Sequence, residues 1–249
     1  MKKIVMNDMI IGEGRPKVCV PIVARTVEEA IVQAAEIDNC DLVEIRGDYI
    51  ENYNNADYVI ELVRNVRNVI DKPFIFTFRT AEEGGERNIR VSAYVNILKT
   101  MIQSGEIQFV DVEFFSGENV VRDIVNFAKE NRVVTIISNH DFNNTPDEQE
   151  MIDRLRAMQR AGADIAKIAV MPQDKTDVLR LMMATEQAEL NIPVITMSMG
   201  KLGILSRIAG EITGSAITFG AAGKTSAPGQ VEVSDLYSIL ELIHNQVQD

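Results

Sequence analysis

Short runs of β-branched and aromatic residues recur along the chain, and the segments between them carry helical spacings of apolar residues. Successive runs begin roughly 20 to 35 residues apart, the length that a strand, a helix and two short loops occupy. Each repeat therefore predicts one strand followed by one helix. The eight predicted strands cover residues 18–23, 42–46, 74–79, 109–114, 133–138, 165–170, 193–197 and 216–219.

Two of the predicted helices have recognisable ends. Residues 145–148 (Thr-Pro-Asp-Glu) have the pattern of a capping box with proline at the first helical position, and Gly162 follows that helix. Ser234 is the predicted N-cap of the last helix. The apolar residues of the last helix fall on one stripe that we expect to face inward: Leu236, Ile239, Leu240, Ile243 and Val247.

Eight strands alternating with eight helices in 249 residues favour an α/β fold of the closed (β/α)₈ TIM barrel type over an open doubly wound sheet. Residues 1–16 precede the first strand and form two short extended pieces around Asn7 and Asp8. We expect this N-terminal β-hairpin to close the bottom of the barrel. Because the sequence has no linker or low-complexity segment, residues 1–249 are predicted to form a single domain.

Composition narrows the classes of function. The formal net charge of −12 argues against nucleic acid and against a membrane surface as partners. Asn7 and Asp8 interrupt the apolar start before it reaches the length of a signal peptide, so a cytoplasmic location is expected. Cys19 and Cys40 lack metal-site spacing and are interpreted as reduced core residues, and a total of two histidines disfavours a zinc site.

Polar residues converge at the predicted barrel mouth, because side chains at the C-terminal ends of the strands face it. Alternation along each strand decides which residues point inward. Met197, Met199 and Phe219 fit either a pocket wall or an ordinary core. The inward sets are Leu42, Glu44 and Arg46; Ile75, Thr77 and Arg79; Ile136, Ser138 and His140; Ile165, Lys167 and Ala169; Met197 and Met199; and Phe219.

Lys167 is the one lysine of ten that lies inside an apolar strand. Placed among Ile and Ala beside Arg46 and Arg79, it is expected to have a depressed pKa, because burial and like charge both disfavour the ammonium form. A neutral amine is a nucleophile. The alternative is a structural lysine paired with Glu113, the last inward carboxylate of its strand.

His140 ends the strand next to that of Lys167, so the two side chains can face a small molecule from neighbouring strands as an acid or base and a nucleophile. A hydrogen-bonded structural histidine is the alternative. His244 is interpreted as a surface residue. Glu82 and Glu83 form an acidic loop, from which one carboxylate can orient His140, although such pairs are usually solvated.

Arg207 follows the turn at residues 200–203, in a region where barrels commonly bind anions, and therefore indicates an anionic ligand. An exposed, unpartnered arginine is the alternative. Residues 220–225 are similar to a P-loop, but the glycines are too close together and no helix follows, so nucleotide binding is rejected. The next segment is predicted to be a lid in which Ser226 and Gln230 donate hydrogen bonds.

These residues lie in motifs that resemble type I 3-dehydroquinate dehydratase along nearly the whole chain. The motifs are Gly12-Glu13-Gly14-Arg15-Pro16-Lys17, Glu44-Ile45-Arg46-Gly47-Asp48, Phe76-Thr77-Phe78-Arg79-Thr80, Glu83-Gly84-Gly85-Glu86, Ser138-Asn139-His140-Asp141-Phe142, Lys167-Ile168-Ala169-Val170-Met171-Pro172, Met197-Ser198-Met199-Gly200 and Ser226-Ala227-Pro228-Gly229-Gln230.

The resemblance implies a (β/α)₈ barrel, usually a homodimer, that converts 3-dehydroquinate to 3-dehydroshikimate without metal or cofactor. This is a step of the shikimate pathway of aromatic amino acid biosynthesis. Lys167 would form a Schiff base with the substrate ketone, His140 would transfer the proton, and Glu83 would orient His140. The implied substrate contacts are Glu44, Arg46 and Arg79 to the ring hydroxyls, Arg207 to the carboxylate, Ser226 and Gln230 from the lid, and Met197, Met199 and Phe219 along the wall.

The sequence departs from many family members at two places. Ile45 and Gly47 stand where tryptophan and a bulkier residue are common, and Ile45 is expected to point outward, so packing rather than catalysis is affected. Pro21 stands where some members place a substrate-binding serine. Two rival functions remain: a class I Schiff-base aldolase, which uses the same barrel, lysine and imine, and a non-catalytic ligand-binding barrel.

Overall fold

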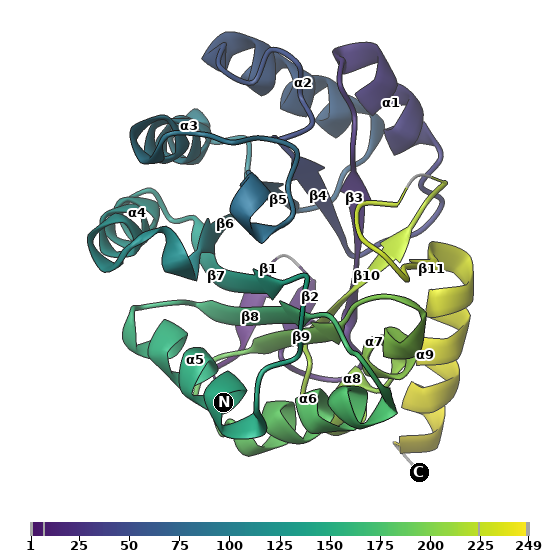
Figure 1. Ribbon diagram of the computed structural model, residues 1–249. Helices are drawn as coiled ribbons and strands as arrows, with labels where there is room; N and C mark the ends of the chain where they lie inside the picture. Colours follow the sequence, from purple (N-terminus) through teal and green to yellow (C-terminus); the bar gives the residue numbers. More distant parts are fainter. Residues whose placement is uncertain (1, 7, 224, 248–249) are drawn as a thin grey trace.

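The computed structural model describes residues 2–6, 8–223 and 225–247. Asn7 of the predicted hairpin and Lys224 of the P-loop-like segment lie outside these residues. Within them, eight parallel strands form one curled sheet and confirm all eight predicted strands (Figure 1). The strands, in sheet order, are β10 (Ile217–Ala221), β3 (Lys17–Ile22), β4 (Leu42–Arg46), β5 (Phe74–Thr77), β6 (Phe109–Glu113), β7 (Val134–Asp141), β8 (Ile165–Val170) and β9 (Val194–Ser198).

The sheet closes between its last strand and its first. The backbone N–H of Ala216 donates to the Val194 carbonyl at 2.7 Å, and Val194 forms a parallel bridge with Ser215. A short strand not predicted from the sequence, β11 (Val231–Glu232), pairs with Gly220 and Ala221 on the edge of β10 away from β3. The result is a barrel with a lightly hydrogen-bonded seam between β9 and β10, as the predicted fold class requires.

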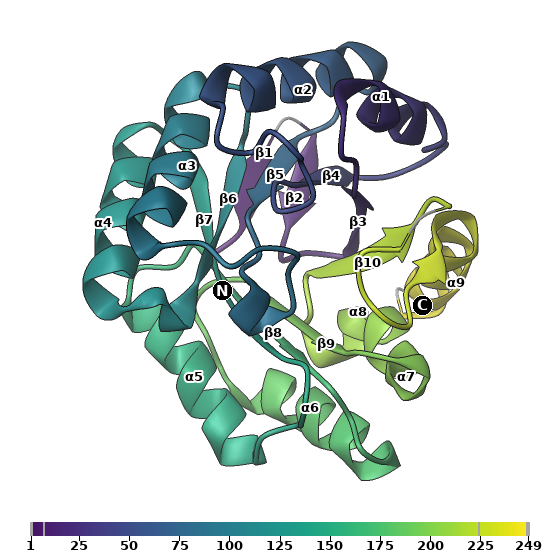
Figure 2. The same cartoon turned by 45° about the horizontal axis from the view of Figure 1, so that its top comes forward.

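Helices cover the outside of the sheet, as both views show (Figures 1 and 2). They begin where polar side chains cap free backbone N–H groups; the Thr26 side chain accepts from Glu29 N, for example. The helices of the described chain are α1 (Val27–Ala35), α2 (Ala56–Val69), α3 (Val91–Ser104), α4 (Glu118–Glu130), α5 (Glu148–Arg160), α6 (Lys175–Gln187), α7 (Ile204–Ile208), α8 (Gly210–Thr213) and α9 (Val233–Val247), with 3₁₀ turns η1 (Ala81–Glu83), η2 (Phe114–Ser116) and η3 (Lys201–Gly203).

Apolar side chains form two separate cores, one between strands and helices and one inside the barrel. Ile45 belongs to the outer core, as expected from its outward position. At the bottom of the inner core, each strand contributes one buried residue. These are Cys19, Leu42, Ile75, Phe109, Ile136, Ile165, Ile195 and Ile217.

The predicted N-terminal hairpin is confirmed and closes this inner core from below. β1 (Ile4–Met6) pairs antiparallel with β2 (Met9–Ile11), and Ile4 and Ile11 are buried against the inner core residues. The bottom of the barrel is therefore sealed by hydrocarbon, and a ligand can reach the interior only from the opposite end.

Two predicted helix starts are wrong. The Thr145 hydroxyl donates to the Met171 carbonyl at 3.1 Å instead of capping a helix, and α5 begins at Glu148 with Asp147 as its N-cap. Ser234 lies inside α9, which begins one residue earlier. The predicted position of Gly162, just after α5, is confirmed by its φ of 95°.

Two expectations for the last helix also need correction. Leu236 and Leu240 of the predicted stripe are buried, but Val247 at its end is 49% exposed. His244 is not a simple surface residue, because it is half-buried and its Nδ1 lies 2.7 Å from Glu211 Oε1.

Cys19 and Cys40 are buried free thiols, as predicted. None of the helices described here has the length and apolar character needed to cross a lipid bilayer.

Candidate active site

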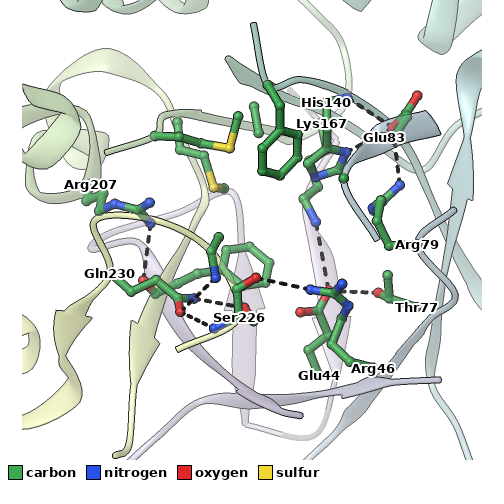
Figure 3. Close-up of a pocket in the computed structure, with 17 residues that line it drawn as sticks. Glu44, Arg46, Thr77, Arg79, Glu83, His140, Lys167, Arg207, Ser226 and Gln230 are labelled. Carbon is green, nitrogen blue, oxygen red and sulfur yellow. Dashed lines mark hydrogen bonds and ion pairs between the residues drawn. The ribbon is translucent and has the colours of Figure 1, made fainter. Parts of the chain in front are cut away.

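A pocket opens at the C-terminal ends of the strands, opposite the hairpin. It brings together all twelve residues singled out from the sequence (Figure 3). They come from five strands and from the segments that follow strands, and they lie up to 186 residues apart in the chain, so only the closed barrel places them side by side. The lining residues are Glu44, Arg46, Thr77, Arg79, Glu83, Gly84, His140, Phe142, Lys167, Ala169, Met197, Met199, Arg207, Phe219, Ser226, Ala227 and Gln230.

Strand alternation explains why the site is polar although the barrel floor is apolar. Two residues beyond the apolar floor, the inward positions of seven strands change to charged, hydroxyl and bulky side chains, and this layer is still buried. It consists of Glu44, Thr77, Asp111, Ser138, Lys167, Met197 and Phe219. A charged layer over a sealed apolar floor gives strong electrostatic interactions, because water that would screen them is excluded.

His140 and Glu83 form one hydrogen-bonded unit at the mouth. His140 Nδ1 lies 3.0 Å from Glu83 Oε2, and the His140 backbone N–H donates to the same oxygen at 3.0 Å. The 3₁₀ turn η1 carries Glu83 inward, and it ends at Gly84 with a φ of 82°. A Cβ at Gly85 would stand 1.9 Å from the Arg79 carbonyl oxygen, so glycine allows this loop to fold back onto the site.

The electrostatics of this pair suit proton transfer. Burial lowers the pKa of His140 well below its usual value, and the nearby cations, led by Arg79, lower it further, so the imidazole is neutral. Burial raises the pKa of Glu83 to about 7, although Arg79 opposes the rise. A neutral imidazole whose Nδ1 faces a carboxylate has its Nε2 free to accept a proton.

Lys167 projects from β8 into the pocket between His140 and Glu44 (Figure 3). Its Nζ donates to Asp111 Oδ2 at 3.2 Å and lies 3.9 Å from Glu44 Oε1. Nζ also lies 4.6 Å from the ring centre of Phe219, which is therefore a direct neighbour of the amine. Carboxylates are thus the nearest charged groups of Lys167.

One predicted partner of Lys167 was wrong. The sequence placed Arg46 and Arg79 beside Lys167, and all three line the same pocket. It offered Glu113 as the structural partner of Lys167. Glu113 instead accepts from the Arg79 guanidinium at 3.1 Å and from the Thr80 hydroxyl at 2.8 Å. The carboxylate that contacts Lys167 is Asp111, which sequence reasoning missed.

Arg79 is the centre of a buried network. Its Nη1 donates to Glu113 Oε1 and Ser138 Oγ at 3.1 Å and to Glu83 Oε2 at 3.3 Å, and its Nη2 donates to Asp111 Oδ1 at 2.7 Å. These contacts keep the pKa of Arg79 well above its usual value despite the opposing effect of burial. Its guanidinium therefore holds the acidic groups of the site in place.

Arg46 joins the mouth to the predicted lid. Its Nε and Nη2 each donate to Asp48 at 2.8 Å, and its Nη1 donates to the Ser226 carbonyl at 3.4 Å. Gln230 Oε1 accepts from Ser226 N at 2.7 Å, and its Nε2 donates to Ser226 Oγ at 3.1 Å. The lid residues are thus tied to each other and, through Arg46, to the barrel.

Arg207 is 1% exposed and has no carboxylate among its contacts in the described residues. Its Nη1 and Nη2 donate to the carbonyls of Phe219 at 3.4 Å and Pro228 at 3.1 Å, and its Nε has no partner in the part of the chain described here. Burial lowers the pKa of Arg207 to about 10. A buried cation without a counter-ion, facing a pocket, is a site for an anionic group.

The carboxyl groups of the pocket are committed to basic side chains. Among residues 2–6, 8–223 and 225–247, no three His, Cys, Asp or Glu residues are arranged to hold a metal ion. The groups that line the pocket offer an amine, an imidazole–carboxylate unit and an arginine without a counter-ion in the described residues. These suit covalent and acid–base chemistry on an organic anion.

Comparison with known proteins gives similarities over nearly the full chain. A model of the type I 3-dehydroquinase family matches residues 18–247. The 3-dehydroquinate dehydratase of Salmonella typhimurium is 43% identical over 250 residues, covering 98% of this chain and 99% of the relative.

Solved structures agree with this similarity. The type I 3-dehydroquinate dehydratase of Clostridium difficile, solved with covalently modified comenic acid, has a TM-score of 0.94 at 45% identity and covers 98% of each chain. The 3-dehydroquinate dehydratase of Geobacillus kaustophilus has a TM-score of 0.95 at 35% identity, covering 98% of this chain and 97% of that chain.

Proposed function

The chain belongs to the type I 3-dehydroquinase family, and from this premise we propose that it dehydrates 3-dehydroquinate through an imine on Lys167. The enzyme is thus a hydro-lyase that forms 3-dehydroshikimate. The observation that supports the residue assignment is the pocket itself, where an amine, a paired imidazole and an uncompensated arginine face one another. The Clostridium difficile relative was solved with covalently modified comenic acid, which agrees with a nucleophilic group in that protein.

Imine formation makes the difficult step feasible. The hydrogen to be removed lies next to the substrate ketone, and a protonated imine on Lys167 withdraws electrons more strongly than the neutral carbonyl. The carbanion is then stored as an enamine. Expulsion of the β-hydroxyl from the enamine gives the conjugated product, and water releases it from Lys167.

His140 serves both proton transfers in this scheme. Its neutral Nε2 takes the proton next to the imine, and the resulting imidazolium returns a proton to the departing hydroxyl oxygen. Glu83 stabilises the imidazolium and fixes the ring orientation through Nδ1. One histidine therefore acts first as the general base and then as the general acid.

Arg207 fixes the substrate by its carboxylate. The ring hydroxyls then face Glu44, Arg46 and Arg79, and Ser226 and Gln230 close over the mouth. The cavity measures about 40 Å³, which is room for a few water molecules. We therefore expect the lid segment to move outward when the six-membered ring enters and to close again around it.

The biological setting follows from the family. We propose that the chain works as a cytoplasmic homodimer in the shikimate pathway of aromatic amino acid biosynthesis. The polar, acidic composition and the relatives from bacteria support this setting.

An ultraviolet assay tests the proposed reaction directly. The product is a conjugated enone and the substrate is not, so absorbance rises as 3-dehydroquinate is consumed. We expect saturable formation of the enone by the purified chain. A chain that binds 3-dehydroquinate in a calorimeter without forming the enone would support a ligand-binding barrel.

Arg207→Gln is expected to raise KM for 3-dehydroquinate about 10- to 100-fold, because it removes charged hydrogen bonds to the substrate carboxylate. The matched control is Lys201→Gln, which removes an exposed cation from the adjoining turn. Steady-state assays measure both. An unchanged KM in the Arg207 variant would place the carboxylate elsewhere.

The kcat of the enzyme is expected to fall as the pH drops through about 7, the pKa of Glu83. Below this pH Glu83 becomes neutral, and a neutral carboxyl group holds the Nδ1 proton of His140 less firmly and can itself donate to Nδ1. The base at Nε2 is then lost.

Glu83→Gln is expected to give a slower enzyme whose kcat lacks this inflection, since the amide does not titrate. Glu82→Gln is the control, because that neighbouring carboxylate is exposed. Rate profiles between pH 5.5 and about 9 measure the difference. An inflection near pH 7 that persists in Glu83→Gln would assign it to another group.

The pocket side chains also help to distinguish dehydration from the rival aldolase reaction. Many class I aldolases act on phosphorylated substrates, which barrels bind with backbone N–H groups after the last two strands. Here the buried guanidinium of Arg207 occupies this region and suits a carboxylate. The geometry therefore favours dehydration of a carboxylic acid.

A further inference from the structure

Asp111 is a buried carboxylate that takes no part in the steps assigned to Lys167, His140 and Glu83. It lies on β6 in the same inward layer as Lys167 and is 1% exposed. Its Oδ2 accepts from Lys167 Nζ at 3.2 Å, and its Oδ1 accepts from Arg79 Nη2 at 2.7 Å and from Ser138 Oγ at 2.6 Å. Donors from three parts of the barrel thus converge on one carboxylate.

Asp111 carries a fixed negative charge. Burial alone would raise its pKa, but Arg79 and Lys167 outweigh burial, and the pKa of Asp111 lies below its ordinary value. Its position is equally fixed, because Oδ1 is anchored by a guanidinium and a hydroxyl. Lys167 therefore faces a rigid anion at one side of its amine.

We propose that Asp111 is the counter-ion that keeps the imine nitrogen on Lys167 protonated. The inference rests on the imine proposed above. Counted from the ammonium form of Lys167, one proton leaves first so that the neutral amine can attack the ketone. An N=C bond then replaces the C=O bond, and the oxygen leaves as water, so that two of the three ammonium protons are lost overall. The third proton stays on nitrogen, so Asp111 faces one positive charge before and after condensation.

The positive charge on the imine nitrogen is needed for the next step, the removal of the C–H proton. Only the protonated imine draws the electrons of the breaking C–H bond onto nitrogen, and a neutral imine is a poor acceptor. In a buried site, where charges are poorly screened, an adjacent carboxylate is the strongest available support for that cation. Loss of the C–H proton to His140 gives a neutral enamine, and departure of the hydroxyl restores the cation beside Asp111.

Position distinguishes Asp111 from Glu44, the other carboxylate near the amine. Glu44 lies 3.9 Å from Nζ, lines the pocket, and accepts from the Thr77 hydroxyl at 2.7 Å. Asp111 does not line the pocket among the described residues and lies behind the amine, bonded to Arg79. A substrate ring that fills the pocket therefore meets Glu44 and leaves the contact between Asp111 and the nitrogen in place.

Chemical trapping tests the counter-ion. Cyanoborohydride reduces the protonated imine selectively, whereas borohydride also reduces the neutral imine. In Asp111→Asn we expect kcat to fall about 100-fold. We expect the borohydride adduct with 3-dehydroquinate to persist. The pH at which cyanoborohydride trapping falls to half should move down by about one unit or more.

Glu113→Gln is the matched control. Glu113 is two residues from Asp111 on the same strand face and also binds Arg79, but it does not contact Lys167. We expect its cyanoborohydride profile to follow that of the unaltered enzyme. A purely structural role for the buried acids would give both variants the same profile.

The outcomes separate the two proposals. A borohydride adduct in the unaltered enzyme, together with an unshifted profile in Asp111→Asn, overturns the counter-ion alone. Absence of any adduct in the unaltered enzyme overturns the imine and its counter-ion together. If Asp111→Asn does not fold, the unaltered enzyme is compared with an imine of the same ketone and butylamine in buffer. Equal pH profiles then contradict the proposal, and a higher midpoint in the enzyme supports it.

Discussion

Lys167→Ala is expected to lower kcat by roughly 10⁴-fold or more while the protein stays folded. Without the amine no imine forms, and the neutral ketone is the only electron acceptor left for the C–H bond. The fold is expected to survive because Asp111 keeps its bonds to Arg79 and Ser138. The enone assay measures turnover, and circular dichroism with thermal melting measures the fold.

Lys175→Ala is the control for this variant. Lys175 is the next lysine along the chain, exposed at the start of α6 and not among the residues that line the pocket. It should turn over like the unaltered enzyme. A normal rate in a folded Lys167→Ala protein would end the imine mechanism.

His140→Ala is expected to form the imine and then stall, with kcat lowered about 10²- to 10⁴-fold. The amine and the binding groups remain, but no base takes the C–H proton. Borohydride added during turnover should therefore convert a large fraction of the variant to a covalent adduct, which intact-mass spectrometry measures.

The second histidine of the chain provides a matched control. His244 contacts Glu211 and is not among the residues that line the pocket, so His244→Ala should keep its turnover. A His140 variant that turns over normally, or that gives no adduct with borohydride, would remove His140 from the proton transfer.

The eight strands could be predicted because parallel strands covered by helices are buried on both faces, so each is a compact apolar run. The motif resemblance to the family is confirmed by the family match. The first residues of the helices were harder to predict. The hydroxyl of Thr145 has a tertiary acceptor, the Met171 carbonyl, and a local capping pattern does not contain that information.

The pocket residues could be predicted because alternation decides which side chains face the barrel axis. Alternation does not decide which charges meet there. The sequence placed Arg46 and Arg79 beside Lys167 but gave no sign that the long side chain of Arg79 reaches the carboxylates of β6. Asp111 alternates with Phe109 and Glu113 on β6, but it lies one layer below the strand end, so the rule that strand ends carry the site selects Glu113 instead.

Peptide mapping of the trapped adduct is the most direct test of the central claim, that the amine of Lys167 bonds covalently to the substrate. The unaltered enzyme is reduced with borohydride during turnover of 3-dehydroquinate and then digested for tandem mass spectrometry. The account predicts a single modified residue, Lys167, carrying the reduced substrate through Nζ. An adduct on another residue, or full turnover without any adduct, would contradict it.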